Sequence, residues 1–189
     1  MEQEIRELIS ESIATKQRIL SMTSLIAQST EILIECLKQG GKILVCGNGG
    51  SAADAQHMAG ELIGRFEVER EGVPCIALTT DSSVLTAWAN DYSYEAVFAR
   101  QVNALGRKED VLVAISTSGM SKNVISAIKE AKKKGMKIVA LTGKDGGVLN
   151  QIENVFNIIV PSYQTSRIQE VHITIIHIWC KLIEDVLFV

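Results

Sequence analysis

Five short apolar segments that alternate with helical segments constrain the fold of this chain more than any other feature. Strands are expected at residues 42–46, 74–79, 111–115, 136–141 and 156–160. Helices are expected between and after them, at residues 51–64, 82–90, 94–105, 121–134 and 164–187. Continuous apolar runs of this length are typical of parallel strands that are buried on both faces. The sequence therefore predicts an α/β fold, a three-layer αβα sandwich around a five-stranded parallel sheet of the flavodoxin-like or Rossmann-like kind.

A long helical region precedes the first expected strand. Apolar residues recur at helical spacing through residues 3–39, and a break is expected at Ser21–Ser24. The first half carries an apolar face formed by Ile5, Leu8, Ile9 and Ile13. That face must be buried either on the sheet of its own chain or on a sister subunit. We expect one domain over residues 1–189, in which residues 1–40 serve packing or oligomerisation.

The first strand leads into a glycine-rich turn and then a helix. The turn reads Gly47-Asn-Gly-Gly-Ser51. Glycine lets a backbone approach a ligand closely, and a helix N-terminus offers free N–H groups and a partial positive charge. His57 and Glu61 follow on the same helix, and their spacing of four residues places them on one face. One strand–turn–helix unit therefore supplies an anion site, an imidazole and a carboxylate.

A second unit of the same kind begins at Asp110. Its strand is followed by the turn Ser116-Thr-Ser-Gly-Met-Ser121, which is rich in hydroxyl groups. Each hydroxyl can rotate to donate a hydrogen bond to a phosphate oxygen. Ligands of doubly wound sheets bind where the strand order reverses. The two turns therefore predict one phosphorylated ligand held across such a point.

Together these motifs resemble the phosphoheptose isomerases of the sugar isomerase (SIS) domain family. The resemblance covers nearly the whole chain and includes Asn90-Asp91, Leu141-Thr-Gly-Lys-Asp-Gly-Gly147 and Arg167-Ile-Gln-Glu-Val-His172, with His177. It implies substrate contacts by Asn48, Gly49, Gly50, Ser51, Glu61, Asn90, Asp91, Ser116, Thr117, Ser118, Ser121 and Gln169. It also implies four zinc ligands, namely His57, Glu61, Gln169 and His177. Glu61 and His177 would be the catalytic acid–base pair.

The same resemblance implies a reaction and an assembly. Sedoheptulose 7-phosphate would become D-glycero-D-manno-heptose 7-phosphate through an enediol, as the first step toward ADP- or GDP-heptose for lipopolysaccharide or capsule. The enzyme would hold one zinc ion per subunit and no nucleotide cofactor, in a homotetramer with active sites at subunit interfaces. One departure is Ser166, because some relatives carry an aspartate there. The alternative is a non-catalytic SIS module that binds the replication initiator, a kind that lacks the paired glutamate and histidine.

The glycine-rich turn also satisfies the G-x-G-x-x-A pattern of dinucleotide-binding proteins. That pattern by itself is a weak signal. A dinucleotide site also needs an acidic residue about 20 positions on, at the end of the next strand. Here the next strand ends near Asp81, well beyond that distance. The hydroxyl-rich second turn also has no role in such a site, so a nicotinamide cofactor is not expected.

The last expected helix carries two histidines for which we expect different roles. His172 lies in an apolar stretch, on the far side of Gln169 from His177, and is predicted to be a buried structural residue. Gln169 and His177 are separated by about 12 Å along a helix axis, whereas metal–ligand bonds are only about 2 Å long. A metal site that uses both is therefore expected to be completed across a subunit interface or to require a distorted helix.

Composition excludes several other classes of protein. The formal net charge of −3 argues against a nucleic-acid-binding protein. No run of 18 apolar residues predicts a membrane span, and Met1–Arg6 lacks the apolar segment of a signal peptide, so we expect a cytoplasmic protein. The four cysteines have no C-x-x-C spacing and are expected to be reduced thiols, mostly in the core: Cys36, Cys46, Cys75 and Cys180.

Overall fold

The computed structural model describes residues 1–189 and has a five-stranded parallel sheet at its centre. Its strands are β1 (Ile43–Cys46), β2 (Cys75–Ala77), β3 (Val111–Ser116), β4 (Lys137–Gly143) and β5 (Phe156–Val160). They lie in the order β2-β1-β3-β4-β5, and every neighbouring pair is parallel. The strand order reverses between β1 and β3, because the chain first builds outward to β2 and then returns. The predicted doubly wound αβα sandwich is confirmed.

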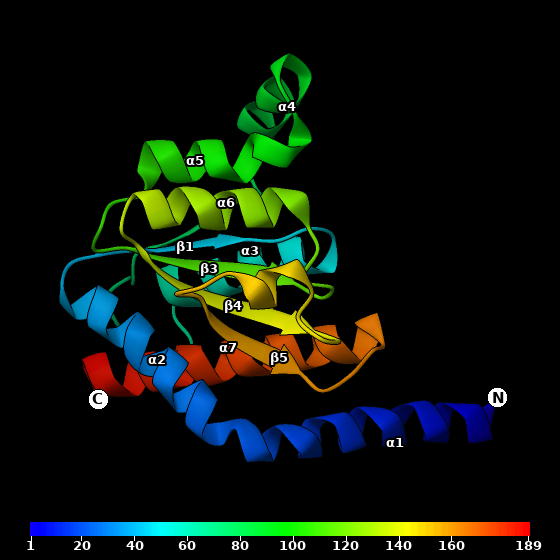
Figure 1. Ribbon diagram of the computed structural model, residues 1–189. Helices are drawn as coiled ribbons and strands as arrows, with labels where there is room; N and C mark the ends of the chain where they lie inside the picture. Colours follow the sequence, from blue (N-terminus) through cyan, green and yellow to red (C-terminus); the bar gives the residue numbers. More distant parts are fainter.

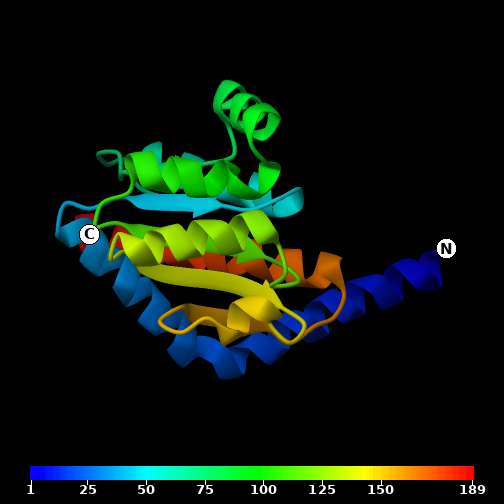
Figure 2. The ribbon, with the colours of Figure 1, turned by 45° about the horizontal axis from the view of Figure 1, so that its top comes forward.

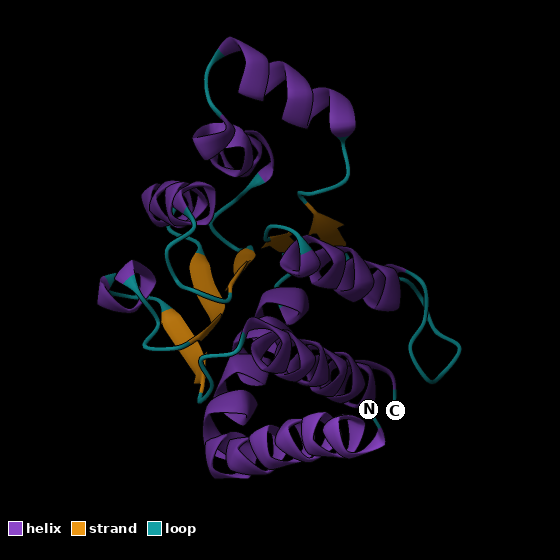
Figure 3. Cartoon of the chain, turned by 90° about the vertical axis from the view of Figure 1, so that its right-hand side faces the viewer, coloured by secondary structure: helices purple, strands orange, loops and turns teal.

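Helices cover both faces of this sheet (Figure 1, Figure 3). On one face lie α2 (Thr23–Lys38), α3 (Gly50–Ile63) and α7 (Thr165–Phe188), and on the other lie α5 (Val97–Leu105) and α6 (Lys122–Lys133). Three short 3-10 helices complete the chain, η1 (Ile19–Met22), η2 (Tyr94–Ala96) and η3 (Val148–Gln151). Helix α4 (Ser82–Asp91) stands away from the sheet beyond α5, and none of its residues is buried (Figure 2).

The strand residues alternate between two hydrophobic cores. Ile43 and Val45 of β1 belong to the core under α2, α3 and α7, whereas Leu44 and Cys46 belong to the core under α5 and α6. Successive side chains of a strand point to opposite faces of the sheet. Because helices cover both faces, both sets of positions are apolar. This two-sided burial explains the continuous apolar runs in the sequence.

The N-terminal region forms two helices, α1 (Glu2–Arg18) and α2, joined by η1. The break therefore falls at residues 19–22, close to the expected position. Helix α1 contacts α7, but Thr15 is its only buried residue (Figure 1). The apolar face predicted for it is about half exposed, at 48% for Ile5, 48% for Leu8, 55% for Ile9 and 52% for Ile13. This face has no full partner within the chain.

The single helix expected at residues 94–105 is instead the 3-10 helix η2 followed by α5, and the other boundaries agree with the predicted ones within two residues. Strand β2, expected at residues 74–79, pairs only over Cys75–Ala77, and at its start Pro74 cannot donate to the sheet ladder. All four cysteines are buried and free, as expected. No helix combines the length and the hydrophobicity needed to span a membrane.

Candidate active site

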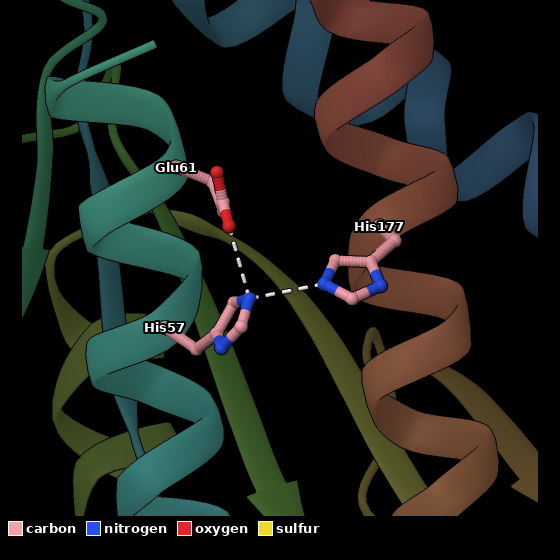
Figure 4. A group of neighbouring side chains, drawn as sticks. All are labelled: His57, Glu61 and His177. Atoms are coloured by element: carbon pink, nitrogen blue, oxygen red, sulfur yellow. Dashed lines mark hydrogen bonds and ion pairs between the residues drawn. The ribbon is translucent and has the colours of Figure 1, made fainter. Parts of the chain in front are cut away.

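Three of the predicted residues meet where α3 packs beside α7 (Figure 4). His57 and Glu61 extend from α3, and His177 extends from α7 toward them. His57 Nε2 lies 3.0 Å from Glu61 Oε1 and 3.0 Å from His177 Nε2. One possible ligand atom from each of the three residues lies within 4.8 Å of the others. We call His57, Glu61 and His177 the triad.

In the triad, one ring nitrogen of His57 faces two partners. His57 Nε2 carries either a hydrogen or a lone pair. It therefore cannot donate to Glu61 and accept from His177 at the same time. A cation between the three atoms would satisfy all of them, since each can present a lone pair.

The donor set of the triad fits a metal ion. Imidazole nitrogens and a carboxylate oxygen are ligands that zinc prefers. Ligand atoms of a tetrahedral zinc site, with bonds of about 2.1 Å, lie about 3.4 Å apart. The distances from His57 Nε2 to Glu61 Oε1 and to His177 Nε2, each 3.0 Å, are close to that value. The triad is therefore a three-ligand arrangement suited to a metal ion.

Gln169, the fourth predicted metal ligand, lies at the other end of the α3–α7 contact. Its amide packs against Gly50, where an added Cβ would have Cδ of Gln169 at 2.9 Å. Helix α7 is a continuous α-helix over Thr165–Phe188, so Gln169 stays about 12 Å from His177 along the axis. Within one chain, the structure thus joins three of the four predicted ligands and places Gln169 beside the glycine-rich turn.

The two predicted phosphate turns lie at the carboxyl ends of the adjacent strands β1 and β3. Gly49 adopts a left-handed conformation, with φ of +56°, and is the N-cap of α3. Ser116 ends β3, and its Oγ donates to Oγ of Ser121, the N-cap of α6, at 3.0 Å. Both turns therefore flank the point where the strand order reverses, each at the N-terminus of a helix.

Sequence reasoning missed Asn123, which joins the two turns, and its neighbour Lys122. The side-chain amides of Asn48 and Asn123 exchange two hydrogen bonds of 2.8 Å, which tie the glycine-rich turn to α6. Lys122 lies next to them and pairs with Glu95 at 2.7 Å, and this hydrogen bond and the charge of Glu95 raise the pKa of Lys122. A cleft of about 490 Å³ here is lined by Asn48, Tyr94, Glu95, Ser121, Lys122 and Asn123. The position of Lys122 and Asn123 directly after the hydroxyl turn was the available signal.

Asp54 is a further residue that the sequence did not single out. It lies on α3, one turn before His57, and its Oδ2 is buried without a hydrogen-bond partner. Burial raises the pKa of Asp54 to about 6, although the charge of His57 acts in the opposite direction. Its spacing of three residues from His57 could have indicated it, because such residues share a helix face.

The two residues predicted to contact the sugar lie apart from the triad. Asn90 and Asp91 are exposed at the end of α4, where Asn90 Nδ2 donates to Asp91 Oδ1 at 2.8 Å. Because α4 projects beyond α5, the structure does not bring these residues to the triad within one chain (Figure 1). Ser166 is likewise exposed, in the first turn of α7.

His172 has the structural role that was predicted. It is fully buried, and its Nε2 lies 3.1 Å from the carbonyl oxygen of Thr142 on β4. Burial lowers the pKa of His172 to about 4, and the hydrogen bond to Thr142 only partly opposes this. His172 therefore stays neutral inside the core and takes no part in the triad.

Comparisons with known proteins agree with this geometry. The SIS domain family matches residues 4–143. Phosphoheptose isomerase of Helicobacter pylori (strain P12) is 55% identical over 179 residues, which cover 95% of this chain and 93% of that protein. The solved structure of phosphoheptose isomerase GmhA from Neisseria gonorrhoeae superposes with a TM-score of 0.90 at 46% identity, covering 97% of this chain and 98% of that one. A phosphoheptose isomerase from Francisella tularensis superposes with a TM-score of 0.93 at 41% identity, covering 97% of each chain. The chain belongs to the phosphoheptose isomerase family of SIS-domain proteins.

Proposed function

We propose that this protein is an aldose–ketose isomerase that converts sedoheptulose 7-phosphate to D-glycero-D-manno-heptose 7-phosphate through an enediol. The observation that carries the proposal is the meeting of Glu61 and His177 at the triad, on helices that also border the phosphate turns. Relatives over nearly the full length, named phosphoheptose isomerases, support the choice of substrate. The product would enter the synthesis of activated heptose for lipopolysaccharide or capsule.

The reaction needs two proton-transfer groups and no external oxidant. A base takes a proton from C1 of the ketose, and the electron pair forms the C1–C2 double bond of the enediol while an acid protonates the oxygen on C2. A proton then returns to C2 as the hydroxyl on C1 loses its own, which leaves an aldehyde at C1. C1 is oxidised and C2 is reduced within one molecule. Glu61 and His177 are the pair proposed to exchange these protons.

The phosphate would be held away from the reacting carbons. Ser116, Thr117, Ser118 and Ser121 can donate to phosphate oxygens, and the N-termini of α3 and α6 add N–H groups and partial positive charge. Asn48, Gly49, Gly50, Ser51 and Gln169 would contact the substrate from the other turn. Binding energy from the phosphate would hold C1 and C2 at the triad. This orientation would accelerate the reaction, because the entropic cost of bringing the reacting groups together is met on binding.

We propose that the metal at the triad is zinc, with one ion per subunit. His57, Glu61 and His177 would hold it through two ring nitrogens and a carboxylate oxygen. When bound, zinc would supply Lewis-acid polarisation of the substrate oxygens and stabilise the charge of the enediolate. Glu61 presents Oε1 to His57, and a carboxylate has a second oxygen that can exchange a proton.

We also propose a homotetramer with active sites at subunit interfaces. The exposed apolar face of α1 and the projection of α4 beyond the sheet support an assembly in which other copies cover both. Replacing Ile9, which is 55% exposed, by glutamate should therefore shift the protein to smaller species in light-scattering chromatography. Gln3→Glu, at an exposed position on the same helix but outside this face, is the control. An unchanged mass for Ile9→Glu would contradict this use of α1.

The first experiment is proton NMR of the protein with sedoheptulose 7-phosphate in D2O. The expected product is the aldose that carries deuterium at C2, because the enediol is protonated by groups in exchange with solvent. Removal of metal by a chelator should stop turnover, and added zinc should restore it. The binding-module alternative is not favoured, since the paired glutamate and histidine are present. Folded protein that forms no aldose with any metal, and that captures a replication initiator, would reverse this conclusion.

A further inference from the structure

The loop over residues 64–72 leaves the triad helix α3 and is held by a buried ion pair. It contains no helix or strand. Arg70 on the loop places Nε 2.9 Å from Oε1 of Glu184 on α7, and the exposed fractions of the two side chains are 1% and 0%. Removing one partner of such a pair leaves an unpaired buried charge. An ion pair this deeply buried therefore fixes the positions of the backbone groups that are hydrogen-bonded to Arg70 and Glu184.

The Arg70 side of the pair holds the end of α3. Its Nη2 donates to the carbonyl oxygen of Glu61 at 2.8 Å, and its Nη1 donates to that of Leu62 at 2.9 Å. The last carbonyl groups of a helix have no N–H partners within the helix. Arg70 thus satisfies the backbone of the turn that carries the Glu61 carboxylate to the triad.

The Glu184 side of the pair holds the loop that reaches the other half of the triad. Its carboxylate accepts hydrogen bonds from the backbone N–H groups of Glu67 at 2.8 Å, Val68 at 3.1 Å and Phe66 at 3.3 Å. The Phe66 ring then lies 5.8 Å from the His177 ring, between centroids, at an interplanar angle of 31°. Phe66 and His177 line the same cleft of about 360 Å³. The loop therefore builds one wall of the triad.

We propose that the Arg70–Glu184 ion pair positions the triad. It would hold Glu61 through the hydrogen bond from Arg70 to the Glu61 carbonyl oxygen, and it would hold His177 through the Phe66 ring. Neither Arg70 nor Glu184 touches the reacting atoms in this proposal. The kinetic consequence rests on the proposed isomerase function, whereas the structural consequence for His177 does not. A displaced triad should lower kcat and leave the phosphate turns, and hence KM, nearly unchanged.

The chain contains a second ion pair with a buried carboxylate, and this pair serves as the control, although its lysine side chain is 20% exposed. Asp110 is 2% exposed and accepts hydrogen bonds from Lys42 Nζ at 2.5 Å and from the backbone N–H groups of Lys42 at 2.9 Å and Arg107 at 2.8 Å. The chemistry resembles that at Glu184, with one cation and several backbone donors. Lys42 and Asp110 directly precede β1 and β3, so this pair lies at the amino ends of the strands, whereas the phosphate turns lie at the carboxyl ends.

The test compares Glu184→Gln, Phe66→Leu and Asp110→Asn in metal-free protein without substrate. The protein has three histidines, so the ring C–H resonances in proton–carbon NMR can be assigned by single substitutions. Glu184→Gln and Phe66→Leu should move the His177 resonances in the same direction, because both withdraw the ring current of Phe66. Asp110→Asn should leave them in place although it lowers the melting temperature.

Activity measurements complete the test. Glu184→Gln should lower kcat about 10-fold or more with KM nearly unchanged, since small misplacements of catalytic groups are costly, whereas Asp110→Asn should keep both. If Glu184→Gln does not fold, Arg70→Lys takes its place, because it keeps the charge but loses the two-armed contact with the α3 carbonyls. Unmoved His177 resonances with unchanged kcat would overturn the proposal. Shifted His177 resonances in a protein without isomerase activity would leave it standing and reject only the proposed function.

Discussion

His172 and His177 lie five residues apart on α7 and have different environments. Five residues turn a helix by about 140°, so the two rings face different neighbours. His172 is fully buried against the Thr142 carbonyl, whereas His177 is partly exposed and faces His57. The same type of side chain therefore has a structural role in the core at one position and belongs to the triad at the other. The triad and the buried histidine are tested separately below.

Glu61→Gln tests the proton-transfer role of the triad. The amide keeps the shape of the side chain but cannot exchange a proton at neutral pH, so kcat should fall by about 100-fold or more. Steady-state kinetics with sedoheptulose 7-phosphate measures this. Glu35→Gln removes an exposed carboxylate that pairs with Lys137, and it should leave kcat unchanged. A loss of only a few-fold for Glu61→Gln would contradict the assignment.

The buried His172 predicts a stability that falls on acidification. The folded chain keeps this ring neutral down to its pKa of about 4, while the unfolded chain takes up a proton near the ordinary value of 6.5. Between these values the unfolded state binds more protons, so the free energy of unfolding decreases as the pH falls, by about 3 kcal/mol in total from this group. Above pH 6.5 the group makes no pH-dependent contribution.

Urea unfolding at a series of pH values measures this effect. His172→Gln should be less stable at neutral pH but should show a flatter dependence on pH between about 6.5 and 4. The wild-type chain provides the reference curve. Parallel pH curves for the two proteins would show that another group controls the acid sensitivity.

At the scale of elements, the hydroxyl turn after β3 is shaped by the loop after β4. Gly119 has φ of +64°, and a Cβ added there would overlap the carbonyl oxygen of Gly146. In return, Leu149 N donates to the Gly119 carbonyl oxygen at 3.0 Å. The two loops therefore pack backbone against backbone, and this contact fixes the position of the hydroxyl groups.

Gly119→Ala should displace the hydroxyl turn and weaken phosphate binding. The added methyl group clashes with Gly146, in addition to the cost of about 1 kcal/mol or more for a left-handed alanine. KM for the sugar phosphate should rise more than kcat falls. Gly40→Ala is the control, because φ there is +76° but a Cβ would meet nothing within 4 Å. It should lose stability alone, and an equal KM for Gly119→Ala and wild type would contradict the proposed phosphate site.

At the scale of the whole molecule, two parts of the chain lack partners. The apolar face of α1 is about half exposed, and α4, which ends with Asn90 and Asp91, stands away from the sheet (Figure 2). The triad itself is complete within one chain, since α3 supplies His57 and Glu61 while α7 supplies His177. An active site at a subunit interface would therefore share α4, and not the triad, between copies.

Mixing inactive subunits tests this division. Glu61→Gln and His177→Ala chains should regain no activity when mixed, because every intact triad needs both residues from one chain. Glu61→Gln and Asp91→Asn chains should regain activity well above either parent, if Asp91 reaches the triad of a neighbour. Differently tagged subunits, recovered together, verify that mixed oligomers form. Recovery in the first mixture would contradict a triad contained in one chain.

Local patterns in the sequence were sufficient for much of this structure. Apolar runs of five or six residues determined the strands, because helices bury both faces of the sheet. The spacing of four residues placed His57 and Glu61 on one side of α3, because the periodicity of a helix depends only on local geometry. The glycine-rich turn and the hydroxyl turn likewise followed from the residues that each backbone conformation requires.

Contacts between distant segments were decided only by the tertiary structure. His177 reaches His57 across 120 positions of sequence, and Asn48 reaches Asn123 across 75, because α3, α6 and α7 pack around one switch in strand order. The same packing leaves Gln169 beside Gly50, and it buries Glu184 beneath the loop that carries Arg70. Sequence periodicity specifies which face of a helix is apolar, but not which other helix faces it or at what height along the axis. The sequence by itself therefore determined the elements and their chemistry, and the packing of helices on the sheet determined which side chains share a site.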